Sequence, residues 1–249
     1  MKKLDVIDYQ VILEHGDIAS MTKHVDKNVQ EMYLRNTVES LGLLDFQTNV
    51  ELNHYIREHN NNIFSLLINY SMMKKYLLQG IPDEPFYGPG DNGVGISYFP
   101  NFNEEHYLYH FWYGFYVESY YFRFQNMIDS KFHVINCKYD LNIQNGLGFQ
   151  KNILKKLKEV NPELHYFFNS MWTTNPIYKK ATTIRNEITH NFSPNKPSSG
   201  LTKHRDNNGK VSLISYGVPD YMPVREIQEN IDNTLVLLSE MSIEIQKIL

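Results

Sequence analysis

Residues 103–131, NEEHYLYHFWYGFYVESYYFRFQNMIDSK, contain the longest aromatic segment of the chain. The first residue, Asn103, is a favoured helix N-cap, and the two glutamates that follow suit the positive end of a helix. Aromatic and aliphatic side chains then fall on nearly every face, without a proline. Since a helix that is apolar nearly all round must be covered by others, the stretch predicts the central helix of a bundle.

The rest of the chain also has mainly helical periodicity. Apolar side chains recur at spacings of three and four residues, which indicates helices with one buried face. We expect such helices over about 22–41, 50–78, 147–160, 162 onward, 176–192 and 223 to the end. The triplet Asn60-Asn61-Asn62 is a point at which the second of them can break into two. Asn161-Pro162 and Asn175-Pro176 are helix starts with proline in its favoured first-turn position.

Two segments interrupt the helical pattern. Residues 80–102 are rich in proline and glycine and predict a loop. Residues 193–222 predict a second loop, with a small β-hairpin around Asn207-Asn208-Gly209. No repeat or linker divides the chain. We therefore expect an all-α fold, an up-and-down helical bundle with long loops, as a single domain over residues 1–249 with a candidate N-terminal extension at 1–20.

Composition excludes several classes of protein. The formal net charge of -4 argues against a protein that coats nucleic acid by bulk electrostatics. Cys137 is the only cysteine, so an intrachain disulfide and a cysteine zinc cage are excluded. The start of the chain lacks the pattern of a secretory signal. His110, Glu118 and Arg123 interrupt the most aromatic stretch, which excludes a membrane span there. We expect a cytoplasmic protein.

The run Arg185-Asn186-Glu187-Ile188-Thr189-His190 carries the candidate chemistry. An arginine binds phosphate through paired hydrogen bonds, and a histidine can pass a proton near neutral pH. On a straight helix, five residues separate the two side chains by about 140° and about 7.5 Å along the axis. The side chains then do not touch, but both can reach one phosphate in a groove formed by a second copy of the helix. The alternative is a solvated arginine and a histidine that caps the helix.

The same run resembles the signature of the HEPN superfamily, R-x4-H with a polar residue, often asparagine, directly after the arginine. The continuation Asn191-Phe192-Ser193-Pro194 is similar to the stand-alone bacterial HEPN proteins. The resemblance implies a homodimer in which the motif helices face each other, and metal-independent cleavage of RNA without a cofactor. It also implies a toxin or phage-defence role, with an antitoxin or regulatory partner.

By the same resemblance, Arg185 binds and stabilises the phosphate, His190 acts as general acid or base, and Asn186 assists. The ribose 2′-hydroxyl attacks the adjacent phosphate and leaves a 2′,3′-cyclic phosphate. Lys179 and Lys180 on the same helix are candidates for binding the substrate. Alternatively, the chain is a non-catalytic HEPN-like dimer that binds a nucleotide or a protein partner.

A third hypothesis is a divalent metal site. His106 and His110 are four residues apart, so one face of the long helix presents both imidazoles. A third ligand would come from elsewhere, for example His54, His59 or His165. The alternative is that both histidines belong to an aromatic layer near the helix start. We assign no residue of the chain as a metal ligand.

Overall fold

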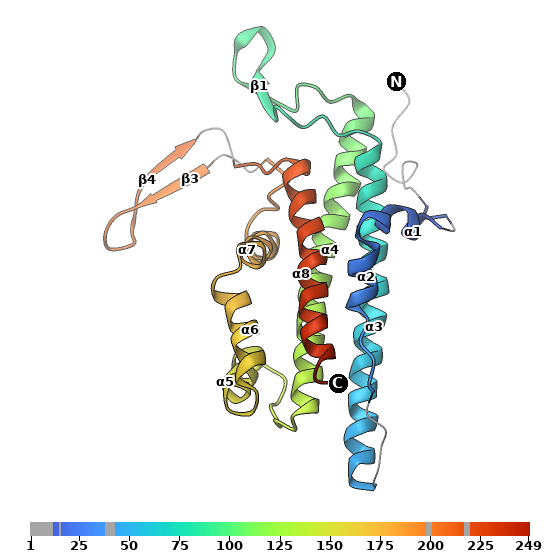
Figure 1. Ribbon diagram of the computed structural model, residues 1–249. Coiled ribbons are helices and arrows are strands. Elements are labelled where there is room, and N and C mark those ends of the chain that lie inside the picture. Colours follow the sequence, from blue (N-terminus) through green and yellow to red (C-terminus); the bar gives the residue numbers. More distant parts are fainter. Residues whose placement is uncertain (1–11, 15, 38–42, 198–200, 217–219) are drawn as a thin grey trace.

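A computed structural model describes residues 12–14, 16–37, 43–197, 201–216 and 220–249. Three long helices form its axis: α3 (Leu43–Leu78), α4 (Glu104–Lys138) and α8 (Val224–Gln246). In Figure 1, α3 runs up, while α4 and α8 run down beside it. The predicted all-α, up-and-down bundle is confirmed.

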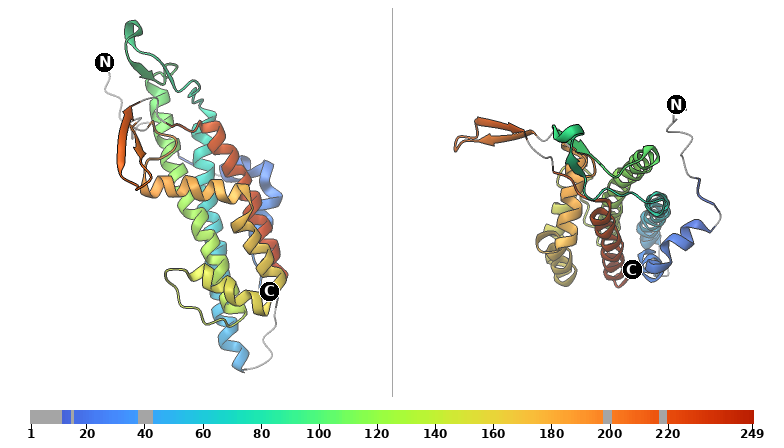
Figure 2. Two further views of the ribbon diagram at one scale, coloured as in Figure 1. Left: turned by 90° about the vertical axis from the view of Figure 1, so that its left-hand side faces the viewer. Right: turned by 90° about the horizontal axis from the view of Figure 1, so that it is seen from above.

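Shorter helices cover the long ones. Near the start of the described chain lie α1 (Asp17–Thr22), a 3-10 turn η2 (Lys23–Val25) and α2 (Asp26–Met32), and α2 packs against α8. On the other side, α5 (Phe149–Val160) and α6 (Pro162–Thr173) form a helical pair. The next helix, α7 (Pro176–His190), crosses the bundle almost at right angles in the left panel of Figure 2.

Buried tyrosines join α4 to α8. The hydroxyls of Tyr113, Tyr120 and Tyr121 bond to Val224 O at 3.0 Å, Thr234 Oγ1 at 2.8 Å and Asn230 Oδ1 at 2.7 Å. All three tyrosines are fully buried. Large rings contribute most to core burial, and each buried hydroxyl needs a partner. These pairs therefore fix α8 against α4 in one register.

Two small antiparallel hairpins project from the bundle. Strands β1 (Tyr87–Pro89) and β2 (Ile96–Tyr98) flank a 3-10 turn, η3 (Asp91–Gly93). Strands β3 (Leu201–Arg205) and β4 (Val211–Tyr216) pair with Lys203 opposite Ile214. The right panel of Figure 2 shows β3 and β4 reaching away from the helices. The predicted hairpin around Asn207-Asn208-Gly209 is confirmed, whereas the first hairpin was expected to be a loop.

Three helix predictions need correction. The expected helix over 22–41 stops at Met32 within the described residues, and 38–42 lie outside them. The expected break at Asn60-Asn61-Asn62 is wrong, because α3 continues through it and Asn60 bonds to the backbone of Leu34. The central helix continues past 131 to Lys138.

The long central helix is also less enclosed than its sequence indicates. The tyrosines that contact α8 lie on the buried face of α4, but a second face is exposed to solvent. Four aromatic side chains on that face are 44–51% exposed: Tyr107, Phe111, Phe115 and Phe122. The bundle therefore covers α4 only in part, and aromatic rings remain on the surface of one side.

Candidate active site

The motif lies on α7, which begins as the sequence predicts. The Asn175 side chain accepts a hydrogen bond from Tyr178 N at 3.0 Å, and Pro176 occupies the first turn. Ala181 and Ile184 are buried and turn the helix towards the bundle. The helix ends at His190, where Asn191 leaves helical geometry. The motif therefore occupies the last two turns of a helix held on one face only.

Arg185 is half-buried at the edge of the contact between α7 and the bundle. Its Nη1 donates to Asn186 Oδ1 at 3.0 Å, so the two side chains hold each other in place. Its Nε is buried and has no hydrogen-bond partner among the described residues. Since a guanidinium has five donors in a fixed fork, this pairing leaves donors to spare for an anion.

His190 lies in the last turn of α7 and is exposed. Within the described part of the chain, no hydrogen bond or ion pair joins it to Arg185, as the helical spacing predicts. Thr183 and Asn186, which lie near His190 on the outer surface of the helix, are also exposed. One copy of the chain therefore offers a half-buried arginine and an open histidine on different sides of one helix.

The segment after α7 is anchored to α4. Asn195 is fully buried, and its Oδ1 accepts a hydrogen bond from Ser193 Oγ at 2.7 Å. Its amide nitrogen packs against Gly114, where any side chain would collide with it. Lys196 forms an ion pair with Glu118 at 2.7 Å. The end of the motif helix is thus held at a fixed place on the bundle.

A second anchor ties this segment to the start of α8. Pro194 O accepts a hydrogen bond from Met222 N at 2.7 Å. The neighbouring Tyr221 hydroxyl donates to the buried carboxylate of Asp83, which also accepts from Val224 N at 2.8 Å. His110 Nε2 lies 3.1 Å from the same hydroxyl. Burial lowers the pKa of His110 to about 4, and the nearby Lys196 charge adds to this, so the imidazole is neutral at pH 7.

The family of the chain follows from a comparison with protein-family models. The model of the HEPN_Cthe2314-like HEPN family matches residues 55–248, more than three quarters of the 249-residue chain. The chain belongs to the HEPN superfamily. No curated protein and no solved structure gives a significant match. The match includes the motif helix, its two anchors, α4, α8 and the part of α3 from residue 55 onward.

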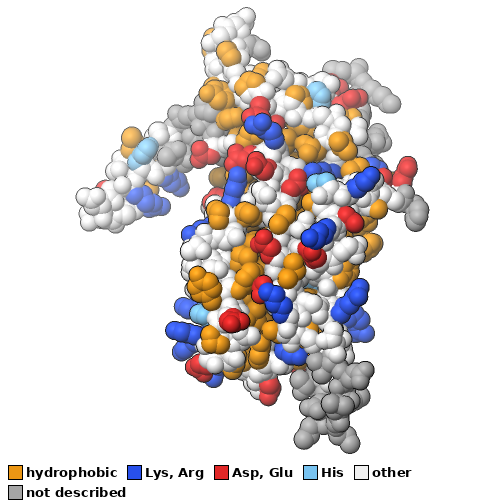
Figure 3. Space-filling model, viewed as in Figure 1, with side chains coloured by type: hydrophobic (Ala, Val, Ile, Leu, Met, Phe, Trp, Pro, Cys, Tyr) orange, Lys and Arg blue, Asp and Glu red, His pale blue; other side chains and the backbone are white. Residues whose placement is uncertain are grey.

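The two lysines predicted to bind substrate in this HEPN protein differ in environment. Lys179 is exposed on α7. Lys180 donates to Glu226 of α8 at 2.7 Å, and this ion pair joins the two helices. Other basic groups lie on the β3–β4 hairpin, the next described element after α7, where Lys203, Arg205 and Lys210 are exposed. Figure 3 shows basic side chains on this hairpin, whereas acidic and basic groups alternate over the bundle.

The histidines of the metal hypothesis bond to protein groups. His106 Nδ1 accepts from Asn103 N at 3.1 Å in a reciprocal cap of α4, and His110 pairs with Tyr221. His59 is fully buried, with Ser130 Oγ 2.8 Å from its Nδ1. Within the described residues, no three histidine, cysteine or acidic side chains come close enough to hold a metal ion.

A pocket of about 640 Å³ opens beside the end of α7. Glu187 lines it from the motif helix and Asn191 from the position after that helix, while Tyr221, Met222 and Glu226 line it from the start of α8 and the segment before it. It lies on the side of α7 that faces α8, and neither Arg185 nor His190 lines it. Sequence reasoning missed Asn195, Tyr221 and Asp83, although Asn195 follows the Ser-Pro pair directly.

Among the helices that the structure describes, none is both long enough and apolar enough to cross a membrane.

Proposed function

We propose that this HEPN protein is a metal-independent endoribonuclease whose site is built from Arg185, Asn186 and His190. The observation that carries the proposal is the arrangement of these side chains at the open end of α7. Arg185 keeps unpaired donors, Asn186 orients it, and His190 is exposed for proton transfer. A HEPN match that includes the whole motif helix supports the same assignment.

In this proposal Arg185 binds the phosphate and stabilises the charge that develops on its oxygens. His190 removes the proton from the ribose 2′-hydroxyl or gives one to the departing 5′-oxygen. The 2′-oxygen forms a bond to phosphorus while the bond to the 5′-oxygen breaks. The products are a 2′,3′-cyclic phosphate and a 5′-hydroxyl.

The site requires two copies of the chain. The side chains of Arg185 and His190 point about 140° apart on one helix. In a single copy, both side chains can therefore contact one phosphate only if the RNA bends around the helix. A two-fold dimer in which the outer faces of two α7 helices meet would place an arginine and a histidine on each side of the groove. A toxin or defence role, with an antitoxin as partner, is part of the same proposal.

The experiment is cleavage of a mixed RNA pool in the presence of a chelator. We expect the wild-type protein to cut and both Arg185→Ala and His190→Ala to lose activity by at least about a hundredfold, the usual contribution of a general acid or base. Lys158→Ala, on the exposed side of α5, is the control for charge and folding. Wild-type activity in both motif variants would rule the proposal out.

The second candidate is a HEPN-like dimer that binds a nucleotide or a protein without cleaving RNA. The pocket of about 640 Å³ beside α7 favours it, because a cavity of this size can hold a small ligand without the motif. Saturable nucleotide binding that survives the double variant Arg185→Ala/His190→Ala, with no cleavage by the wild type, would support this candidate instead.

A further inference from the structure

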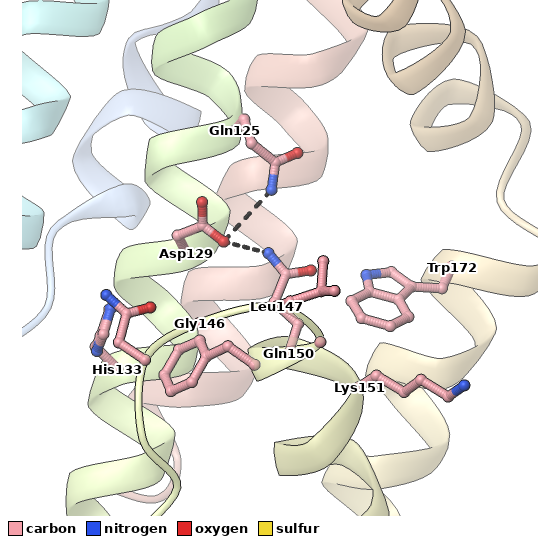
Figure 4. A pocket seen from close by; sticks show the side chains of 11 residues that line it. Gln125, Asp129, His133, Gly146, Leu147, Gln150, Lys151 and Trp172 are labelled. Carbon is pink, nitrogen blue, oxygen red and sulfur yellow. Dashed lines mark hydrogen bonds between the residues drawn. The ribbon is translucent and has the colours of Figure 1, made fainter.

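A separate pocket of about 440 Å³ lies between α4, α5 and α6. Its volume is within the usual range of small-ligand sites. Figure 4 shows its side chains, which come from three helices and from the loop before α5. Six of them form the acceptor, the walls and the rim of the pocket: Gln125, Asp129, Phe149, Gln150, Lys151 and Trp172.

A carboxylate lies inside this pocket. Asp129 Oδ1 accepts hydrogen bonds from Gln125 Nε2 at 3.4 Å and from Gln150 Nε2. Both dashed lines in Figure 4 end on this oxygen. Among the described residues nothing donates to Oδ2, so the pocket has a vacant acceptor beside two amides. A vacant carboxylate oxygen beside two amides suits a ligand that carries N–H donors and an acceptor along one edge.

Aromatic rings form the sides of the pocket. Trp172 lines one side, and its Nε1 is buried without a hydrogen-bond partner in the described structure. Phe149 lies against His133, with ring centroids 4.5 Å apart. Flat rings of this kind hold a planar heterocycle by stacking. The indole N–H is one more donor that a bound ligand can use.

The rim of the pocket is positive. Lys151 is exposed in the first turn of α5. The N-cap of that helix is Gly148, at a φ of 80°, and no side chain caps the first backbone N–H groups. These groups and the helix dipole favour an anion and disfavour a cation. The pocket thus combines an acceptor inside with a positive entrance, which suits a base with a phosphate attached.

The pocket lies at the end of the bundle from which α6 leads into α7. Trp172 is in the last turn of α6, just before α7 begins. Tyr178, in the first turn of α7, lies within electrostatic range of both Asp129 and Arg185: burial raises its pKa, Asp129 adds to the rise and Arg185 opposes it. Tyr178 and Arg185 are two turns apart on one side of the helix, about 10.5 Å along the axis. A strand held in the pocket can therefore continue along α7 towards Arg185.

We propose that this pocket binds a guanine base of the RNA and that Asp129 selects it. Guanine alone among the four RNA bases has two adjacent N–H donors, N1–H and the 2-amino group, beside an acceptor, O6. In the complex the two donors bond to Oδ2 and Oδ1 of Asp129, and the glutamine amide that guanine displaces from Oδ1 donates to O6 instead. The inference rests on the proposed function for the claim that the guanine belongs to a strand cut at Arg185 and His190.

Trp172 provides a binding test that needs no cleavage. The chain has two tryptophans, so Trp112→Phe leaves Trp172 as the only indole reporter. In this background we expect guanosine 5′-monophosphate to quench the fluorescence saturably and at least about tenfold more tightly than the adenosine, cytidine and uridine monophosphates, as bidentate pairing with a base predicts. Asp129→Asn is expected to remove this preference. Glu163→Gln, an exposed carboxylate on α6, is the matched control.

Lys151→Ala separates the base from the phosphate and does not disturb the carboxylate. It should weaken binding of guanosine 5′-monophosphate but leave the binding of guanosine unchanged, whereas Lys158→Ala on the same helix should affect neither. Equal binding of all four nucleotides, or unchanged guanine preference in a folded Asp129→Asn variant, would overturn the proposal. Tighter binding of N-acetylarginine amide than of the guanine nucleotide would overturn it too, since the pocket would then be built for a guanidinium.

The two proposals can fail separately. Guanine-selective quenching without RNA cleavage would remove the nuclease and keep the guanine pocket. Cleavage with no preference for guanine near the cut, together with no selective quenching, would keep the nuclease and remove the pocket.

Discussion

Asn60 shows how one side chain joins α3 to the extended segment that follows α2. Its Oδ1 accepts from Leu34 N and its Nδ2 donates to Leu34 O, both at 3.0 Å. We predict that Asn60→Ala lowers the free energy of unfolding by about 1–3 kcal/mol, because both backbone groups of a buried residue lose their partner. Urea unfolding would measure the change. Asn61→Ala, at the exposed next position, should change it by less than about 0.5 kcal/mol.

The sequence could not reveal this role. Three consecutive asparagines are poor helix formers, so the pattern favoured a break in the helix. The contact that outweighs this preference comes from Leu34, 26 positions earlier. By contrast, Asn103, Asn161 and Asn175 cap their helices as predicted, because a cap depends on residues only three positions away.

Lys131 makes stability depend on pH. It is fully buried, 3.4 Å from His59 Nε2, and burial lowers the pKa of both groups well below their ordinary values of 10.5 and 6.5. The unfolded chain therefore binds more protons than the folded one as pH falls through those ordinary values, so stability decreases with falling pH.

We predict that Lys131→Met raises the unfolding free energy at pH 7 and that the gain shrinks as pH approaches 10.5, the ordinary pKa of lysine. Chemical denaturation at several pH values would measure this. Lys158→Met on the exposed side of α5 should give a small difference that does not change with pH. A destabilised Lys131→Met variant at pH 7 would show that the lysine is charged and paired in the folded protein.

At the scale of elements, the contact between α4 and the segment after α7 fixes the motif helix. Gly114 is buried on α4, and Asn195 fills the space that a side chain would need. We predict that Gly114→Ala pushes Asn195 out and destabilises the protein by about 1–3 kcal/mol, the usual cost of overpacking. Thermal unfolding and RNA cleavage should both report the change.

Asn195→Gly is the complementary variant for this contact. In combination with Gly114→Ala it should recover part of the lost stability, because the added methyl group then has room. If the double variant is destabilised by the sum of the two single changes, the two residues do not interact as described.

The helices could be predicted from the sequence more readily than the contacts between them. The start of α7 and its buried positions follow from Asn175-Pro176 and from the spacing of Ala181 and Ile184. The candidate site on the same helix could be located but not completed. Asn195, Tyr221 and Asp83 lie on three separate segments, and only the fold brings them together around His110. The pocket around Asp129 and Trp172 likewise combines residues from three helices, which no local motif reveals.

At the scale of the whole molecule, the proposal depends on a dimer formed by α7. Thr183 is exposed on this helix, on the face that the proposed dimer buries. We predict that the wild-type protein has twice the mass of one chain in solution. Thr183→Glu should weaken the dimer at least about tenfold, because two like charges would face each other across the two-fold axis. Sedimentation would measure both proteins, and Lys158→Glu on α5 is the control.

An interface elsewhere would contradict this arrangement. The open aromatic face of α4 (Tyr107, Phe111, Phe115 and Phe122) is an apolar surface on one of the long helices. If Phe115→Glu separates the dimer and Thr183→Glu does not, the copies associate through α4. The two motif helices would then lie apart.

In the proposed mechanism, the ribose 2′-hydroxyl cleaves RNA at Arg185 and His190 without a metal ion. The most direct measurement is the chemical identity of the cut ends, determined by mass spectrometry after digestion of a short RNA in the presence of a chelator. The proposed mechanism predicts 2′,3′-cyclic phosphate and 5′-hydroxyl ends, and no cutting of the same strand when 2′-deoxy residues replace all of its riboses. Ends with a 3′-hydroxyl, cutting of the deoxy strand, or cleavage that appears only when a divalent metal is added would contradict it.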